Sequence, residues 1–360
     1  MPASLIARRP ALACLLVMLL VWLAGCRGQP KPFQQESYVF GTRVEVLIHG
    51  VPEARARAAA NQVLGEFDRL HRMLHAWQPS ELTRLNAAIA RGEPEIPVSA
   101  ELADLLTHAR GLAVDTEGLF DPGIGQLIGL WGFHGDQYMP RLPGPEALQS
   151  ALRARPGLAQ VRIEGLKVSC PNRAVQIDLG GYAKGYALDR AVALLKAAGV
   201  DNALINIGGN LMALGSKGNL PWRVGIQHPR EPRPMATLPL YDGEAIGSSG
   251  DYQRYFELEG VRYSHLLDPR TGQPARSAQG VTVLITPRAR AGTLSDALSK
   301  PVFIAGAGHW QALAGKLGLT HVLRVDEGGR VSVSRALAER LAWEPGLGAD
   351  GVVELAGPPP

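Results

Sequence analysis

The segment from Ile177 to Asp189 constrains the fold more than any other, because it combines a strand pattern, a glycine pair and a helix pattern in one short run. Residues 175–178 alternate apolar and polar side chains, which is the period of a β-strand. Gly180 and Gly181 permit a sharp backbone reversal without obstructing side chains. Apolar residues then recur at helical spacing, and residues 203–207 have the pattern of a second strand. The segment therefore predicts the centre of a βαβ unit.

The predicted turn is a candidate anion-binding element. A strand–turn–helix directs free backbone N–H groups at whatever lies in front of the turn. Asp178 and Lys184 add a carboxylate and an amine beside it. An ordinary βαβ connection without a ligand explains the same pattern equally well, so both interpretations stay open on this segment alone.

The N-terminal residues carry the marks of an exported precursor. Arg8 and Arg9 precede an apolar run over residues 11–24, and the run ends in Leu23-Ala24-Gly25-Cys26, with small residues at the cleavage site. The run is shorter than the ~20 residues of a membrane span. Its ending resembles a bacterial lipobox, in which Cys26 would carry the lipid, palmitate included, and become the mature N-terminus. An uncleaved anchor is the alternative, and both readings place the folded part outside the cytoplasm.

Composition excludes several classes of protein. The chain of 360 residues is 46% hydrophobic and 19% charged, which suits a globular protein with an ample core. Its net charge of +4 is spread over many arginines without a dense basic stripe, so no nucleic-acid partner is expected. With Cys14 in the signal and Cys26 lipidated, only Cys170 remains, which excludes an intramolecular disulfide and a cysteine-based metal or redox site.

Helix boundaries can be read from capping residues. Ser80 and Ser99 each precede a helical pattern and are expected N-caps. A further helix is expected over 294–305, capped by Ser295 and disturbed by Pro301.

Two other polar positions are candidates for chemistry. His265 lies at a predicted strand end beside an Asp-Pro turn, and Asp296 lies in the first turn of a predicted helix, with Ser299 and Lys300 beyond it. Each also has a purely structural explanation. A lone histidine is usually structural, and an acidic residue near a helix N-terminus is stabilised by the helix dipole. Asp296 and Lys300, four residues apart, predict a surface ion pair. Residues 247–250 do not form a G-x-S-x-G elbow, and the zinc-protease HExxH motif is missing. Scattered carboxylates and backbone oxygens would suit Mg²⁺.

Several short motifs span residues 38–310. In chain order they are Phe40-Gly41-Thr42, Ser80-Glu81-Leu82-Thr83-Arg84-Leu85-Asn86, Phe120-Asp121-Pro122, Leu130-Trp131-Gly132-Phe133, Asp178 to Asp189, Asn206-Ile207-Gly208-Gly209-Asn210, Gly250-Asp251-Tyr252, Tyr263 to Gly272 and Asp296-Ala297-Leu298-Ser299. Each motif is weak alone. Together, behind a lipobox, they resemble the FAD:protein FMN transferase family, the ApbE-like flavin transferases.

The resemblance implies an enzyme that binds FAD with Mg²⁺ and transfers the FMN moiety to a Thr or Ser hydroxyl of an acceptor protein, releasing AMP. The acceptors would be flavin-carrying subunits of membrane electron-transfer complexes. By motif match, His265 would be the general base on the acceptor hydroxyl. Asp296 would ligate Mg²⁺, with oxygens from Gly181 and Ser299. The residues that the resemblance places against the cofactor are Phe40, Leu119, Phe120, Asp121, Asp178, Lys184 and Leu267.

The chain departs from the family pattern at three positions. Phe40 stands where a methionine is common, and the aromatic residue expected over the flavin is displaced, leaving Ala76 at its place and Trp77 beside it. Lys300 stands where the family has a metal-binding threonine, and an ammonium group cannot ligate a cation. The metal would then have fewer protein ligands, or Lys300 would supply positive charge at the pyrophosphate, or the enzyme would be weakened. We expect activity to be retained because the other motifs are intact.

The expected fold is α+β, a single elaborated domain with two lobes around a central βαβ unit and with mixed and antiparallel strands. Residues 1–25 are assigned to a lipoprotein signal peptide, 26–37 to a tether, 38–345 to the flavin transferase domain and 346–360 to a flexible tail. The expected location is the periplasmic face of a bacterial membrane, with the inner membrane favoured.

Two other functions would use the same residues. An FAD pyrophosphatase that yields FMN and AMP needs the same site with water as the acceptor. A non-catalytic FAD-binding lipoprotein is the second alternative, which Lys300 favours and the intact His265 and Asp296 oppose.

Overall fold

The computed structural model describes residues 31–135 and 139–357. The chain divides into two units, Met1–Pro32 and Phe33–Pro360, and the described helices and strands lie in the second. No helix within the described ranges is long and apolar enough to cross a membrane. The assigned signal peptide and Cys26 lie outside these ranges, so the lipid anchor stays a prediction.

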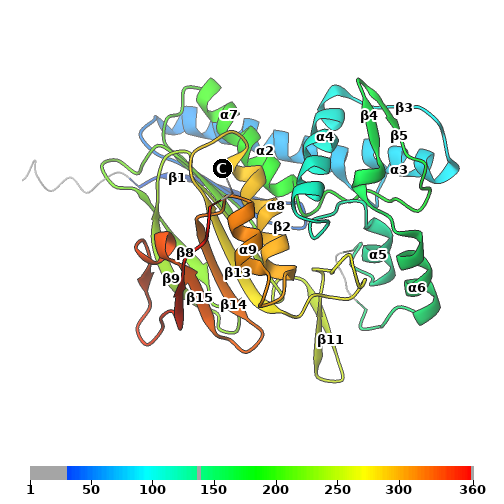
Figure 1. Cartoon of the computed structure of the whole chain (residues 1–360). Coiled ribbons are helices and arrows are strands. Elements are labelled where there is room, and N and C mark those ends of the chain that lie inside the picture. The colour runs from blue at the N-terminus through cyan, green and yellow to red at the C-terminus, as the bar shows by residue number, and fades with distance from the viewer. Residues whose placement is uncertain (1–30, 136–138, 358–360) are drawn as a thin grey trace, which may run out of the picture. The chain divides into compact units, whose positions relative to one another are not determined.

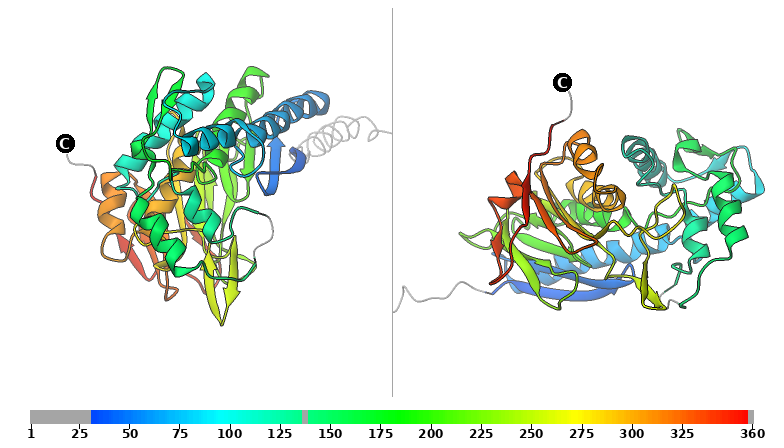
Figure 2. Two further views of the ribbon diagram at one scale, coloured as in Figure 1. Left: turned by 90° about the vertical axis from the view of Figure 1, so that its right-hand side faces the viewer. Right: turned by 60° about the horizontal axis from the view of Figure 1, so that its bottom comes forward.

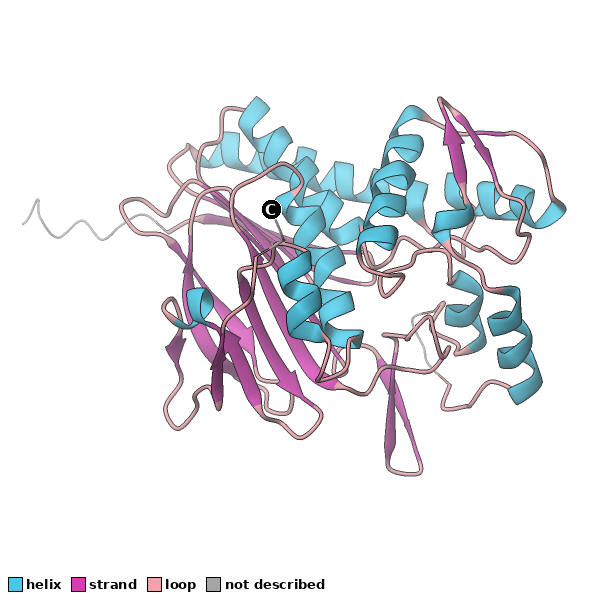
Figure 3. Ribbon diagram, in the orientation of Figure 1, coloured by secondary structure: helices cyan, strands magenta, loops and turns pink. Residues whose placement is uncertain are grey.

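A nine-stranded sheet is the framework of the second unit (Figures 1 and 3). Its strand order is β1-β2-β6-β7-β10-β13-β14-β15-β17. Neighbouring strands are antiparallel, except that β15 and β17 are parallel. This mixed sheet in one unit confirms the expected α+β class. The strands of the large sheet are β1 (Phe33–Val39), β2 (Thr42–Ile48), β6 (Ala203–Ile207), β7 (Asn210–Leu214), β10 (Ala245–Gly250), β13 (Ala278–Ile285), β14 (His321–Asp326), β15 (Val331–Ser334) and β17 (Gly351–Val353).

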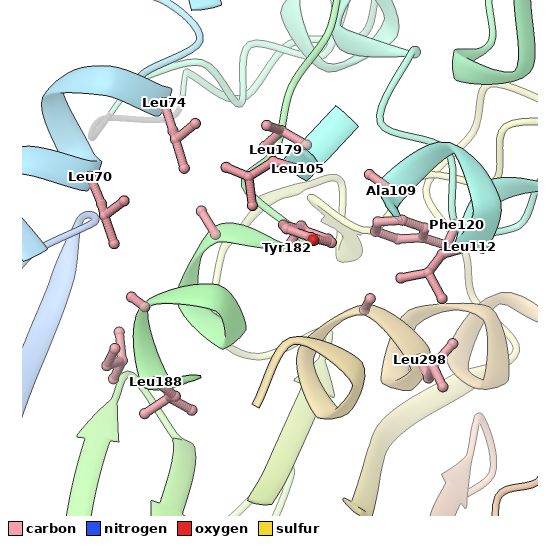
Figure 4. Packing of buried hydrophobic residues seen from close by; sticks show 14 of the residues in the cluster. Leu70, Leu74, Leu105, Ala109, Leu112, Phe120, Leu179, Tyr182, Leu188 and Leu298 are labelled. Atoms are coloured by element: carbon pink, nitrogen blue, oxygen red, sulfur yellow. The ribbon is translucent and has the colours of Figure 1, made fainter. Parts of the chain in front are cut away.

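Helices pack against one face of this sheet. α8 lies on β10 and β13, α7 lies beside α8, and α2 lies beside α7. Their apolar side chains form the main core together with those of α4, as Figure 4 shows for Leu70, Leu105, Leu188 and Leu298. The helices are α2 (Glu53–Leu74), α3 (Glu81–Arg91), α4 (Ala100–Asp115), α5 (Gly125–Leu130), α6 (Pro145–Ala154), α7 (Ala183–Ala197), α8 (Ala291–Ile304), α9 (Trp310–Lys316) and α10 (Arg335–Ala338), with the 3₁₀ turn η1 (Leu158–Gln160).

A second apolar core forms on the opposite face of the sheet. Along β13, Val283 and Ile285 belong to the main core and Leu284 belongs to the second, because successive side chains point to opposite faces. A small sheet supplies the partner residues, among them Val224 and Leu238. This small sheet contains β8 (Trp222–Gln227), β9 (Pro234–Leu240) and β16 (Ala342–Trp343).

A third apolar cluster joins α5 and α6 to a long hairpin. Trp131 and Phe133 pack here with Phe256 and Leu267, and the rings of Trp131 and Tyr263 stack at 5.7 Å. The hairpin projects from the rest of the unit (Figure 2). It contains β11 (Tyr255–Leu258) and β12 (Val261–Ser264), and a remaining small sheet contains β3 (Ile96–Pro97), β4 (Arg162–Glu164) and β5 (Lys167–Ser169).

The predicted strand before the glycine turn is absent, which corrects the expected βαβ unit. Gln176 makes only an isolated bridge with Ile124. The side-chain amide of Asn86 replaces a neighbouring strand: its Nδ2 donates to the Ile177 carbonyl oxygen at 2.9 Å, and its Oδ1 accepts from the Ile177 N–H at 2.8 Å. One buried amide therefore satisfies both backbone groups that a ladder would otherwise pair.

The expected helix starts are confirmed in two cases and wrong in one. Ser80 and Ser99 cap α3 and α4 through their hydroxyl oxygens. The third helix begins at Ala291 rather than at the expected Leu294, and Ser295 lies inside it with its hydroxyl donating to the Gly292 carbonyl oxygen.

Both expected flexible ends contain strands of the large sheet. β1 begins at Phe33, within the assigned tether, and Arg57 lies 5.1 Å over the Phe33 ring. β17 lies within the assigned tail and pairs with β15. β1 is mostly polar and β17 has only three residues, so neither edge strand has a strong sequence pattern.

Candidate functional site

The site is built where α7 crosses α8 at close range. Gly185 allows this approach, since a Cβ there would lie 2.3 Å from the Gly292 carbonyl oxygen and 2.7 Å from Asp296 Cβ. Asp189, one turn further along α7, binds the start of α8. Its carboxylate accepts from the Gly292 and Thr293 N–H groups at 2.8 Å and from the Thr293 hydroxyl at 2.6 Å. Asp189 thus caps α8 from a neighbouring helix and fixes the two helices relative to each other.

Asp296 is the buried anion of the site. Its Oδ2 accepts from the Gly185 N–H at 3.0 Å, and its Oδ1 accepts from Lys300 Nζ at 2.6 Å. Only 1% of the Asp296 side chain is exposed. Burial opposes ionisation, but the charges of Lys300 and Lys184 and these hydrogen bonds outweigh it, so the pKa of Asp296 is below its usual value. The carboxylate is therefore ionised.

Lys300 is held in place by two hydrogen bonds and by packing over Gly181. Its Nζ donates to Asp296 Oδ1 and, at 2.7 Å, to the Asp296 carbonyl oxygen. Its aliphatic chain lies over Gly181, where a Cβ would be only 2.8 Å from Lys300 Cε. The predicted ion pair with Asp296 is confirmed, but it is buried within the site rather than on the surface.

A second lysine, Lys184, interacts electrostatically with Asp296 and Lys300. Lys184 is half-buried. Burial lowers its pKa, the charge of Asp296 raises it, and the charges of Lys300 and Arg254 lower it. Lys300, Lys184 and Arg254 thus act on the same few groups, and a cluster of basic side chains favours binding of an anion.

Several backbone N–H groups of the glycine turn already have partners within the protein. The N–H groups of Tyr182 and Ala183 both donate to the Leu179 carbonyl oxygen, at 2.9 and 2.8 Å. The N–H of Gly185 is taken by Asp296. Since these donors are already satisfied, lysine side chains are the main source of positive charge at the site.

Asp178 lies at the other side of the glycine turn. Its carboxylate accepts from the Gly180 N–H at 2.7 Å and from Trp77 Nε1–H at 3.2 Å. Burial raises its pKa, against the effect of these two hydrogen bonds. The Trp77 ring lies 5.1 Å from His134 and packs over Gly129, where a Cβ would be 3.3 Å from the ring. The displaced aromatic residue therefore contacts the glycine-turn segment after all.

His265 presents a neutral imidazole. Its Nδ1 lies 3.0 Å from the Arg254 carbonyl oxygen. A carbonyl oxygen can only accept, so Nδ1 carries the proton and Nε2 is the basic nitrogen. Burial and the charges of Arg254, Lys184 and Lys300 lower the pKa of His265 to about 3, against a backbone hydrogen bond that acts the other way. The Phe133 ring meets the imidazole at 6.4 Å, nearly perpendicular to it.

The apolar candidates divide between two places. Phe120 is buried, and its Cε2 would lie 3.7 Å from a Cβ at Gly181, so it borders the glycine turn; Leu119 is buried beside it. Phe120 lies with Tyr182 and Leu112 in Figure 4. Leu267, in contrast, belongs to the third apolar cluster.

Phe40 occupies a strained position in the hairpin between β1 and β2. Phe40 and Gly41 form its two-residue turn with φ of 57° and 68°, a combination typical of a type I′ turn. A left-handed conformation is unfavourable for a bulky aromatic residue and is commonly found at functional sites. The Phe40 ring packs on Phe67 and His71, at 6.2 and 5.6 Å.

Asp121 has a structural role that accounts for its carboxylate. Its Oδ1 accepts from the Gly123 N–H at 2.7 Å and from the Leu158 N–H at 2.8 Å, which joins two loops. Burial raises its pKa, against these hydrogen bonds. Contact of Asp121 with a cofactor stays a prediction.

The described residues do not fit the Mg²⁺ set that the resemblance implied. They contain no cluster of three or more His, Cys, Asp or Glu side chains suited to a metal. The Asp296 carboxylate is paired with an ammonium group, and the Ser299 hydroxyl donates to the Asp296 carbonyl oxygen and lies 2.8 Å from Ser249 Oγ. Mg²⁺ requires an octahedral set of oxygen ligands, of which few come from the protein. The ammonium group of Lys300 would repel a cation bound beside it.

The structure thus brings together Gly181, Lys184, Asp296 and Lys300, with His265 in the same electrostatic neighbourhood. Three contributors were not among the predicted site residues, namely Trp77, Asp189 and Arg254. Asp189 was detectable in principle, since it lies four residues after Gly185 and so on the same face of α7. The carbonyl contact of Arg254 depends on the hairpin fold and leaves no local sequence signal.

Known proteins resemble this chain in sequence. The model of the ApbE family matches residues 40–323. An FAD:protein FMN transferase of Rhodobacter capsulatus is 42% identical over 87% of the chain, and the chain spans 59% of that relative's length. An FAD:protein FMN transferase of Klebsiella pneumoniae is 32% identical, with 86% of this chain and 90% of the relative covered.

Solved structures of similar proteins have the same fold. The ApbE protein of Thermotoga maritima superposes with a TM-score of 0.76 at 32% identity, covering 85% of this chain and 98% of that one. The apo form of the Pseudomonas stutzeri flavinyl transferase ApbE gives a TM-score of 0.73 at 30% identity, covering 87% and 98%. The predicted family and the expectation of a transferase are confirmed, and the chain belongs to the ApbE family.

Proposed function

We propose that this protein transfers the FMN moiety of FAD to a Thr or Ser hydroxyl of an acceptor protein and releases AMP. The observation that carries this proposal is a buried aspartate paired with Lys300, with Lys184 and a neutral histidine close enough for their charges to interact. The names of the relatives, FAD:protein FMN transferase, supply the substrate.

The residues of the site suit attack of a hydroxyl on a pyrophosphate. The bond that forms joins the acceptor oxygen to the FMN phosphorus, and the bond that breaks joins that phosphorus to the oxygen of the departing AMP. Lys184 and Lys300 bind the pyrophosphate and neutralise the charge that moves onto the leaving phosphate. His265 Nε2 accepts the hydroxyl proton, which is the role of a general base.

Mg²⁺ dependence was implied by the resemblance, but it is not part of this proposal. When bound in a related site, a divalent ion would polarise the pyrophosphate. No step is assigned to it here, because the Asp296 carboxylate already carries Lys300.

We place the reaction at the periplasmic face of a bacterial membrane, with the acceptors among flavin-carrying subunits of membrane electron-transfer complexes. The lipobox-like sequence ending in Cys26 supports this location, since it predicts an exported, lipid-anchored protein. The absence of a dense basic stripe from the sequence supports a protein rather than a nucleic acid as the partner.

Covalent flavin on a protein is the direct test. The purified enzyme is incubated with FAD and with membranes from a strain that lacks it, and the proteins are separated in a denaturing gel. We expect a fluorescent flavin band and an equimolar release of AMP. Release of FMN and AMP without a labelled protein would favour the FAD pyrophosphatase, and FAD binding without AMP would favour the non-catalytic lipoprotein.

A further inference from the structure

We infer that Lys300 is a built-in cation that takes the place of a divalent metal at the pyrophosphate, so that flavin transfer in this protein does not depend on Mg²⁺. The inference rests on the proposed function, because the anion in question is the pyrophosphate of FAD. It concerns Lys300 of this chain, at the position where the sequence analysis noted a departure from the family pattern.

The first observation is the position of the ammonium group. Lys300 Nζ lies 2.6 Å from Asp296 Oδ1, with a second hydrogen bond to the Asp296 carbonyl oxygen at 2.7 Å. The carboxylate oxygen Oδ1 would otherwise be available to a cation. An ammonium has three N–H donors, so one donor is left to interact with a bound anion.

The second observation is that the site makes room for this side chain. Lys300 Cε and Cδ would lie 2.8 and 3.0 Å from a Cβ at Gly181. Any side chain at position 181 would therefore displace the aliphatic part of Lys300. Only 14% of the Lys300 side chain is exposed, so the ammonium is presented at a fixed place rather than on a mobile surface chain.

The third observation is the charge of the neighbourhood. Asp296 is the ionised carboxylate beside Lys300 and Lys184, and both lysines, with Arg254, act on His265. Asp178, on the other side of the glycine turn, and Asp189, at the start of α8, both have their pKa raised by burial. A divalent ion at Asp296 would have to displace Lys300 from that carboxylate, and the neighbouring ammonium group would oppose its two positive charges.

The test compares metal-free and Mg²⁺-containing conditions in matched variants. Lys300→Thr introduces a hydroxyl that can ligate a metal, and Lys300→Met keeps the length of the chain without its charge. Lys196→Thr is the control, because Lys196 is an exposed lysine on α7. The readouts are FAD affinity from flavin fluorescence, flavin transfer in the gel assay, and binding of Mn²⁺ followed by electron paramagnetic resonance.

In the wild type and in Lys196→Thr, we expect FAD affinity and transfer to be the same in EDTA and in Mg²⁺, with no bound Mn²⁺. Lys300→Thr should bind FAD roughly tenfold more weakly in EDTA, as expected for the loss of one charge-assisted hydrogen bond, and should regain affinity with Mg²⁺. The same variant should bind Mn²⁺. Lys300→Met should be impaired in both conditions.

The outcomes separate this inference from the proposed function. Loss of wild-type transfer in EDTA with recovery in Mg²⁺, or stoichiometric Mn²⁺ binding by the wild type, overturns the inference and leaves the transferase proposal intact. Metal-independent FAD binding without any flavin transfer refutes the proposed function and supports the role of Lys300 in binding. The two wild-type measurements decide the question even if both Lys300 variants fail to fold.

Discussion

His265 is the residue on which the proposed chemistry depends most directly. Its Nδ1–H is engaged by the Arg254 carbonyl oxygen, which orients the ring and leaves Nε2 as the base. Arg254, Lys184 and Lys300 all disfavour the imidazolium in the free protein. A pyrophosphate bound to these cations would offset their charge and make His265 more basic, so substrate binding and base strength are coupled.

Replacing His265 should separate binding from transfer. We expect His265→Ala to lower the flavin transfer rate by roughly 10²–10⁴-fold, the usual contribution of a general base, with FAD affinity nearly unchanged. The rate is measured by flavin fluorescence on the acceptor and the affinity by fluorescence titration. His309→Ala, at an exposed histidine paired with Glu117, is the control. Transfer at the wild-type rate in His265→Ala would remove this residue from the mechanism.

The depressed pKa of His265 also predicts how stability depends on pH. Its pKa is about 3 in the folded protein, against an ordinary value of 6.5 in the unfolded chain. Below about pH 6.5 the unfolded chain binds a proton that the folded protein does not, so stability falls as the pH falls toward the folded pKa.

We therefore expect His265→Asn to lose less stability than the wild type between about pH 7.5 and 5. Urea midpoints measured at both pH values give the difference. An equal fall in the two proteins would show that the imidazole of His265 titrates normally in the folded state.

At the scale of elements, the contact between α7 and α8 decides the geometry of the site. Gly185 sets the distance between the helices, and Asp189 fixes the start of α8. The same contact delivers the Gly185 N–H to Asp296. Helix packing and the electrostatics of the site therefore depend on the same few atoms.

A methyl group at Gly185 should disturb both the packing of α7 on α8 and the electrostatics of the site. Its Cβ would lie 2.3 Å from the Gly292 carbonyl oxygen, so Gly185→Ala must push α8 away and should cost about 1–3 kcal/mol in the free energy of unfolding. We also expect weaker FAD binding, because Asp296 and Lys300 move with α8.

Gly65→Ala is the matched control for this prediction. Gly65 lies within α2, and a Cβ there would meet nothing within 4 Å, so the change should stabilise the protein by roughly 0.5–1 kcal/mol. Chemical denaturation measures both variants. A Gly185→Ala protein as stable as Gly65→Ala would contradict the close helix contact.

At the scale of the whole molecule, the folded unit that begins at Phe33 contains all the described site residues. The lipobox-like segment precedes it in the sequence. We therefore expect membrane attachment and catalysis to be separable.

Cys26→Ala should abolish lipid attachment without changing FAD binding. Metabolic labelling with a palmitate analogue, followed by gel fluorescence, measures the acyl group. Cys170→Ala is the control, since Cys170 is buried in the folded unit and has its pKa raised by burial. A labelled Cys26→Ala protein would show that the lipid is attached elsewhere.

The sequence alone determined the family, the mixed class of fold and most of the residues that meet at the site. The family followed from the resemblance of the combined motifs, and the elements of the fold followed from local periodicity and from the serine caps of α3 and α4. The same local rules failed where distant residues replaced local partners. Asn86 pairs with Ile177 in place of a strand, and Asp189 caps α8 from another helix in place of Ser295.

Only the tertiary structure decided the electrostatics of the site. Spacing along the helix predicted that Asp296 and Lys300 could pair, but whether that pair lies on the surface or in the site depends on what packs around it. Gly181 and Gly185 come from a segment more than a hundred residues earlier in the chain, and their missing side chains admit Lys300 and bring α7 onto α8. Burial then turns an ordinary surface ion pair into a fixed charge, because desolvation and long-range contacts are set by the fold and not by neighbouring residues.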